Sequence, residues 1–272
     1  MNSSLTFDDL FTAWLSASLE VREIVADLAP EQLALPTGCS AWNVQDIFAH
    51  IIDIEWLMSG QPPMDHEPDW ESLPELGRSG RVTEVGVDGR RNHNLAELLD
   101  EFDEVIARRQ TQLMSGSHDL TSLVKGPTGT DWTLQKSFEM RINDTWVHGQ
   151  DIRTAIGQPG GLESPAAQIS AQSLMEMLPI AWAKTVQAPI GSSLEIRITA
   201  PFTLSTQVTI DDDGRANLTS DQTPTVVVEG AWGVLLPLLT GRSNDAALKA
   251  ELKIDGDAEL AGRLLAKMAI TS

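Results

Sequence analysis

A glycine-rich segment, GQPGG at 157–161, separates two halves of the chain that have different hydrophobic periodicities. Before it, apolar residues recur every three or four positions, which is the period of an amphipathic helix. After it, a helix-like stretch at 165–186 precedes short runs of alternating and β-branched residues, which are typical of strands. We therefore expect a two-domain α+β fold, with a helical domain over 1–160 and a smaller α+β domain over 161–272.

The helical half contains four amphipathic stretches, at about 7–28, 44–58, 95–113 and 133–156. Thr6 with Asp9, and Asn43 with Asp46, have the spacing of helix-capping pairs at the start of the first two. Four such helices with connections of this kind predict a four-helix bundle. Between the second and third helices, residues 61–91 are rich in proline, glycine and charge, so we expect a long loop there and interpret it as a lid over the metal pocket considered below.

The α+β half contains strand-like runs SLEIRITA, STQVTIDD, RANLTS, TVVVEG and ELKIDG. The sequence DDDG at 211–214 predicts a hairpin turn between two of them. The chain closes with a helical pattern, DAELAGRLLAKMAI.

The charge balance excludes some classes of partner. The chain has 19 Lys and Arg against 39 Asp and Glu, a net charge of -20, which repels phosphate backbones and anionic lipid. We expect no nucleic-acid partner and no membrane partner, and no apolar run reaches the ~18–20 residues of a membrane helix. Without a secretory signal pattern at the N-terminus, a cytoplasmic location is predicted. The single cysteine, Cys39, excludes an intrachain disulfide and a cysteine-rich zinc site.

A row of polar residues runs along the helix predicted at 133–156. Arg141, Asp144, His148 and Asp151 follow at spacings of three, four and three, which places them on one side of a helix, close beside its apolar stripe. A charge inside a bundle must be paired or bound to a metal. Asp and His four residues apart can reach one ion, and His50, on the flank of the second helix, is the candidate for a third ligand.

Ordinary explanations of these residues remain open from spacing alone. The spacing of Asp144 and His148 also fits a simple ion pair at the margin of the core. His50 also fits an ordinary core histidine with a hydrogen-bond partner. Asp151 is placed either to orient the imidazole of His148 or as a surface carboxylate near the helix end.

Two stretches, SAWNVQDIFAHI at 40–51 and RINDTWVHGQDIRTAIGQP at 141–159, resemble the mycothiol-dependent maleylpyruvate isomerase family, whose N-terminal part is a DinB-like metal-binding bundle. TVVVEGAWGVLLPLLTGR and LKIDGDAELAGRLL resemble the sterol-carrier-protein-like domain often attached to it. The resemblance implies that His50, Asp144 and His148 bind a divalent metal, usually zinc. The best-known member has glutamate at the acidic position, where this chain has Asp144.

The resemblance also implies a reaction type, in which a low-molecular-weight thiol, mycothiol, adds to a substrate alkene and leaves after rotation. Expected partners are therefore a thiol and a small electrophile, in an isomerase or a thiol S-transferase. Arg141 and Asp151 are the expected catalytic residues beside the metal, with Arg141 and Arg242 as candidate partners of an anionic substrate. The alternatives are a metal-containing protein that binds an apolar ligand without turnover, and a zinc-dependent hydrolase.

Overall fold

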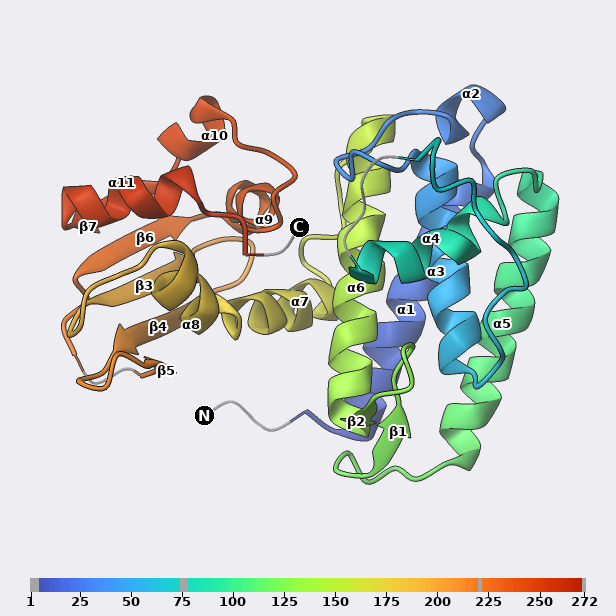
Figure 1. Ribbon diagram of the computed structural model, residues 1–272, viewed down its shortest axis with the longest axis horizontal. Helices are drawn as coiled ribbons and strands as arrows, with labels where there is room; N and C mark the ends of the chain where they lie inside the picture. The colour runs from blue at the N-terminus through green and yellow to red at the C-terminus, as the bar shows by residue number, and fades with distance from the viewer. Residues whose placement is uncertain (1–4, 74–77, 220–221, 271–272) are drawn as a thin grey trace. The chain divides into compact units, whose positions relative to one another are not determined.

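A computed structural model describes residues 5–73, 78–219 and 222–270 of the chain. The chain divides into two compact units, Met1–Gly160 and Gly161–Ser272 (Figure 1). The first unit is mainly helical, and the second combines helices with a five-stranded sheet. The predicted fold class, a two-domain α+β chain with the helices in its N-terminal part, is confirmed.

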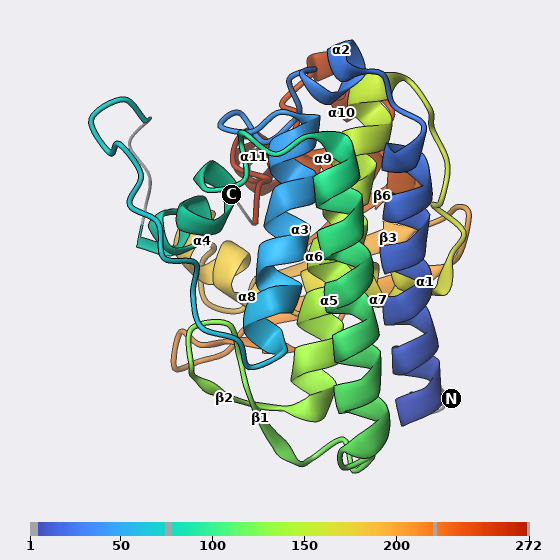
Figure 2. The ribbon, with the colours of Figure 1, turned by 90° about the vertical axis from the view of Figure 1, so that its right-hand side faces the viewer.

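Four long helices form the first unit, as the apolar periodicity predicts. They are α1 (Phe7–Ala26), α3 (Val44–Met58), α5 (Leu95–Ser115) and α6 (Leu134–Ile156). They run side by side in Figure 2, and α1 and α3 each contact both α5 and α6. Capping boxes at Thr6, Asn43 and Asn94 begin three of them, because each cap side chain accepts a backbone N–H that the first helical turn leaves unpaired. Gly157, in the left-handed conformation with φ 69°, ends α6.

Three smaller elements complete this unit: α2 (Pro30–Leu33), α4 (Arg78–Asp88), and a hairpin of β1 (Leu123–Lys125) and β2 (Asp131–Thr133). The prediction of a loop throughout 61–91 is therefore wrong for α4. Gly86, one of the glycines that suggested a loop, lets α4 approach α3: a Cβ at this position would lie 1.9 Å from the carboxyl carbon of Asp53. Contact with α3 stabilises a helix that the composition of the segment does not predict.

The second unit is built on a sheet with the strand order β5-β4-β3-β6-β7. The strands are β3 (Ser193–Ile198), β4 (Leu204–Ile210), β5 (Ala216–Leu218), β6 (Val226–Gly230) and β7 (Lys253–Gly256). β3 and β6 are parallel and the other neighbours are antiparallel. Leu194 lies opposite Val226, and Ile196 opposite Val228. These four buried side chains share one face, because residues two apart in a strand point the same way.

The helices of this unit are α7 (Pro165–Met175), α8 (Leu178–Ile180), the π-helical turn η1 (Ala181–Thr185), α9 (Trp232–Leu239), α10 (Ala246–Ala250) and α11 (Ala258–Ala266). The continuous helix predicted over 165–186 is interrupted between α7 and α8. Pro179 explains the interruption, because proline has no N–H to continue the hydrogen-bond ladder. The predicted turn at 211–214 joins β4 and β5.

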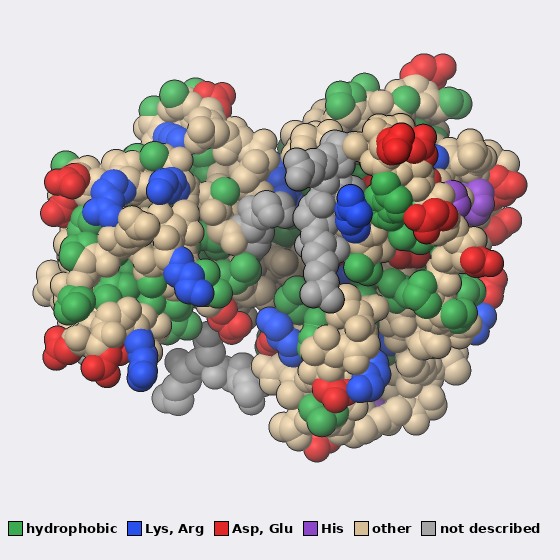
Figure 3. Space-filling view, viewed as in Figure 1, with side chains coloured by type: hydrophobic (Ala, Val, Ile, Leu, Met, Phe, Trp, Pro, Cys, Tyr) green, Lys and Arg blue, Asp and Glu red, His purple; other side chains and the backbone are tan. Residues whose placement is uncertain are grey.

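Acidic side chains lie scattered over both units on the face drawn in Figure 3, with basic side chains among them. In the part of the chain that the structure describes, no helix has the length and apolar character needed to cross a membrane.

Candidate metal centre

The polar row predicted on α6 faces the interior of the bundle. Arg141, His148 and Asp151 are buried, at 4%, 7% and 4% exposure, and the side chain of Asp144 retains 28%. The helical period accounts for this placement, since the row lies beside the buried residues Phe138, Thr145 and Ile152. Opposite the row, α3 contributes His50, which is 4% exposed.

His50, Asp144 and His148 each present one ligand atom to a common point, with all three atoms within 4.8 Å of one another. Nε2 of His50 lies 3.2 Å from Oδ2 of Asp144, and Nε2 of His148 lies 3.7 Å from its Oδ1. The two imidazole rings are nearly perpendicular, with centroids 4.9 Å apart. Asp144 therefore reaches both histidines in spite of its short side chain.

This donor set fits a divalent metal ion. Tetrahedral zinc with nitrogen and oxygen ligands at about 2.0–2.1 Å keeps its ligand atoms roughly 3.3 Å apart, close to the two distances to Asp144. Two imidazoles and one carboxylate are also a donor set that catalytic zinc sites use, with a fourth position left open. Among the described residues, Nδ1 of His50 is buried without a hydrogen-bond partner.

Asp151 fixes the ring of His148. Its Oδ2 accepts a hydrogen bond from Nδ1–H of His148 at 3.1 Å, so the opposite nitrogen, Nε2, faces Asp144. A carboxylate on the remote nitrogen of a metal-binding histidine sets the tautomer and the direction of the ring. Asp151 is 4% exposed, so the alternative that it is a surface carboxylate is wrong.

The ionisation of the cluster follows from its burial and its charges. Burial opposes the charged imidazolium of His148, but hydrogen bonds from the ring to Asp151 and Cys39 and the charge of Asp144 raise its pKa to about 10. Burial lowers the pKa of His50 below its ordinary value, against the opposing effect of Asp144. Burial also opposes ionisation of Asp144, yet Arg141 and His50 hold the pKa of this carboxyl well below its usual range.

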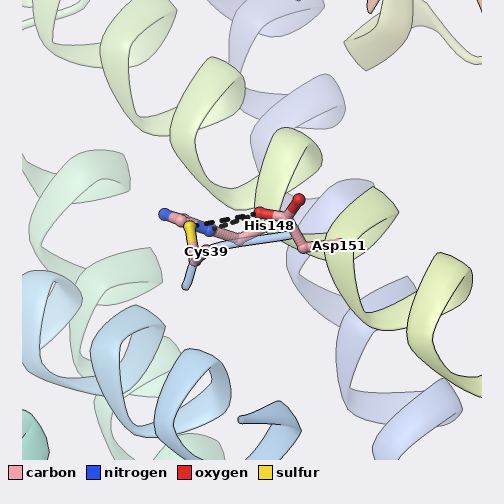
Figure 4. Close-up of side chains that lie close together, drawn as sticks. All are labelled: Cys39, His148 and Asp151. Carbon is pink, nitrogen blue, oxygen red and sulfur yellow. Dashed lines mark hydrogen bonds and ion pairs between the residues drawn. The ribbon is translucent and has the colours of Figure 1, made fainter. Parts of the chain in front are cut away.

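Cys39 lies beside the pair of His148 and Asp151, which the sequence did not predict (Figure 4). Its Sγ is 3.7 Å from Oδ2 of Asp151, and Cys39, His148 and Asp151 form a second set of potential ligands within 4.8 Å. Thr37 brings the thiol here by accepting the backbone N–H of Cys39 and donating to the carbonyl of Trp42. The short turn before α3 thus places the side chains of Cys39 and Trp42 against the centre.

Trp42 covers the histidines. Its ring centroid lies 4.7 Å from that of His50 and 5.9 Å from that of His148, and its Nε1 donates to Glu84 of α4 at 2.9 Å. This indole excludes water from one side of the imidazoles, and it connects the centre to α4. Trp42 lies in the stretch SAWNVQDIFAHI that carries the family resemblance, but its place against the histidines was not predicted.

Arg141 is occupied by protein groups on all three of its nitrogens. Nε donates to Glu55 at 2.8 Å, Nη1 to Asp144 at 2.8 Å, and Nη2 to Thr145 at 3.3 Å. Glu55 was not predicted, although it is completely buried at 0% exposure. Arg242, the other candidate arginine, belongs to the second unit and donates to the carbonyl of Thr240.

Comparison with protein families gives a match over each unit. Residues 14–153 match the mycothiol maleylpyruvate isomerase N-terminal domain, and residues 168–263 match the MDMPI C-terminal domain. No curated protein matches the chain.

Solved structures with a similar fold include the mycothiol-dependent maleylpyruvate isomerase and a mutant of it in which a histidine is replaced by alanine. The unmodified protein is 14% identical with a TM-score of 0.55, and the mutant 13% with 0.59. Each comparison covers 93% of this chain and 95% of the other. At these identities the likeness establishes the fold alone. Sterol carrier protein 2 like 2 from Aedes aegypti, at 17% identity, matches 37% of this chain and 97% of its own length. Its TM-score of 0.28 is too low to establish a common fold.

Proposed function

The chain belongs to the mycothiol maleylpyruvate isomerase family, and from this premise we propose that it is a metal-dependent enzyme that uses a low-molecular-weight thiol, of the mycothiol kind, to isomerise or modify a small electrophile. The observation that carries the proposal is the convergence of His50, Asp144 and His148 within 4.8 Å. The family includes an isomerase that depends on mycothiol, which favours a thiol as the second reactant here.

The residues that would hold the metal are His50, Asp144 and His148, and zinc suits two imidazoles and a carboxylate. A bound divalent ion supplies a Lewis acid that favours the thiolate, the nucleophilic form of a thiol. The protein's own groups do the rest of the preparation. Asp151 holds the ring of His148 through Nδ1, and Trp42 shields the imidazoles from water.

We propose that Arg141 hydrogen-bonds to Asp144 and does not bind the substrate. Its three nitrogens donate to protein acceptors, and the residue is 4% exposed. An anionic group of a substrate would have to displace one of these buried hydrogen bonds to reach the guanidinium, at a cost of about 1.5–3 kcal/mol for a bond to a charged group. This geometry favours a positioning role for Arg141 over direct contact with the substrate.

Metal analysis of the purified chain tests the first half of the proposal. We expect about one zinc-like ion per chain, because the three ligands converge on one point. His148→Ala and Asp144→Ala should each remove the ion. Cys39→Ala is the matched control: it removes a donor only from the second set of potential ligands and should leave the metal content unchanged. Loss of metal in Cys39→Ala would instead place the ion between Cys39, His148 and Asp151.

A thiol-dependence assay tests the second half. Maleylpyruvate and a panel of model electrophiles are offered to the metal-loaded protein with and without mycothiol. Turnover only in the presence of the thiol is the expected result. Hydrolysis without any thiol would make the chain a metal-dependent hydrolase, and binding of an apolar ligand without turnover under either condition would make it a binding protein.

A further inference from the structure

Glu55 is a completely buried carboxylate that accepts three hydrogen bonds from three different helices. Its Oε1 accepts from Nε1 of Trp14 on α1 at 3.0 Å and from Nε of Arg141 on α6 at 2.8 Å. Its Oε2 accepts from Nε of Arg109 on α5 at 3.1 Å. Since Glu55 itself belongs to α3, this one side chain joins all four long helices of the bundle.

The hydrogen bonds continue from Glu55 to the candidate metal centre. The guanidinium of Arg141 donates through Nε to Glu55 and through Nη1 to Oδ2 of Asp144, both at 2.8 Å. Because a guanidinium is planar and rigid, fixing Nε by one carboxylate also fixes the direction of Nη1. Oδ2 of Asp144 is thereby held beside Arg141 and Nε2 of His50, and Oδ1 is directed to Nε2 of His148.

We propose that Glu55 is a positioning residue for the metal centre, which holds Arg141 so that Arg141 fixes the carboxylate of Asp144 toward both histidines. The inference rests on the proposed function, because it concerns the same metal. Glu55 is five residues beyond His50 on α3, and within the described part of the chain its hydrogen bonds go to Trp14, Arg109 and Arg141, so its influence on the three ligand side chains is exerted through Arg141.

Charge supports the same role. Arg109 and Arg141 bring two positive charges into the bundle, and Glu55 and Asp144 bring two negative charges. Without the charge of Glu55, these four groups would carry a net charge of +1 instead of zero, which makes binding of a dication less favourable. Arg141 would also have Asp144 as its remaining carboxylate partner, and it would compete with the metal for that oxygen.

The test is the metal affinity of Glu55→Gln in the full chain, which changes the charge and keeps the shape. Zinc affinity is measured by competition with a chromophoric chelator, and the visible absorption of bound Co²⁺ reports the coordination geometry. We expect zinc binding to weaken about 10- to 100-fold, as for other groups that orient metal ligands, and the Co²⁺ spectrum to change. A residue that only stabilises the fold would leave both unchanged in folded protein.

Arg109→Met is the matched control, because Arg109 is buried like Arg141 and donates to the same carboxylate, while its other hydrogen bonds go to Met58 and Gln112. It should lower stability and leave zinc affinity within about threefold of the wild type. If Glu55→Gln does not fold, the double variant with Arg109→Met removes one positive and one negative charge together. That variant should still show the weakened zinc affinity, because Asp144 is then the only carboxylate among the hydrogen-bond partners of Arg141.

A double-mutant cycle shows whether Glu55 acts through Arg141. In an Arg141→Met background, Glu55→Gln should change zinc affinity by less than about threefold, because two residues of one network are not additive. An equal loss in both backgrounds would overturn the inference, and so would an unchanged affinity of folded Glu55→Gln. If the wild type itself bound no metal, the proposed function would fall and this inference with it, so the two failures are distinguishable.

Discussion

The metal-free protein should lose stability between about pH 6 and pH 9 because of His148. Its pKa is raised to about 10 in the folded chain, against an ordinary value of 6.5. A group with a raised pKa binds its proton more tightly when folded, so its contribution is fully present below pH 6.5 and is lost as the pH rises through about 10. The pH dependence of this contribution is opposite to that of a paired carboxylate, whose stabilising contribution is lost in acid.

The magnitude follows from these two values. The difference between about 10 and 6.5, at about 1.4 kcal/mol for each pH unit, corresponds to a contribution of about 5 kcal/mol at low pH. At pH 6 most of this remains, and at pH 9, one unit below the folded value, about 1 kcal/mol remains. The free energy of unfolding should therefore fall by about 3 kcal/mol between these pH values on account of His148 alone.

The assay is guanidinium unfolding of chelator-treated protein, followed by far-UV circular dichroism at pH 6 and pH 9. His148→Gln provides the reference, because every other group that titrates in this range is present in both proteins. The wild type should lose about 3 kcal/mol more than His148→Gln. Asp151→Asn, which keeps a hydrogen-bond acceptor and removes the charge, should give an intermediate difference. Equal pH dependence of the wild type and His148→Gln would refute the reasoning.

Three further predictions concern the helical unit, Met1–Gly160. Zinc binding at about pH 6.5 should release about one proton, that of His148, measured by calorimetry in buffers of different ionisation enthalpy; release of none would contradict a charged imidazole in the metal-free state. Gly86→Ala should cost about 3 kcal/mol in unfolding experiments, because its Cβ displaces the buried, ion-paired Asp53, whereas Gly262→Ala, where a Cβ meets nothing within 4 Å, should cost nothing. Trp42→Phe should lower stability by about 1–2 kcal/mol through the lost indole donor, with metal content unchanged; loss of the metal would show that the indole hydrogen bond supports the ligands.

The polar row of α6 was predictable because the helical period alone determines which residues share a face. Arg141, His148 and Asp151 are buried beside the apolar stripe for that reason. His50 lies opposite the row only because α3 and α6 are neighbours. The spacing of residues within one helix gives no information about which helices are neighbours. The place of His50 on the flank of the second helix made it a candidate ligand, and the family resemblance implied that it shares one metal with Asp144 and His148.

Cys39 and Glu55 were not predictable by the same means. Cys39 reaches Asp151 because the turn before α3 is held by Thr37, and turn geometry of this kind has no periodic signal. Glu55 is buried because α1, α5 and α6 each supply a donor to it. A carboxylate in an apolar helix therefore gives little indication of its partners until the other helices are in place.

The way α4 is anchored determines how this side of the bundle can move. Arg90, just beyond α4, is 1% exposed and ion-pairs with Asp53 of α3 at 2.8 Å, and Arg91 pairs with Asp46 and Glu84. Detaching the helix would break the ion pairs that Arg90 and Arg91 make with Asp53 and Asp46 of α3. These ion pairs, together with the hydrogen bond from Trp42 to Glu84, hold α4 against α3 beside the candidate metal centre, so a ligand of the proposed enzyme would have to reach the metal without moving α4.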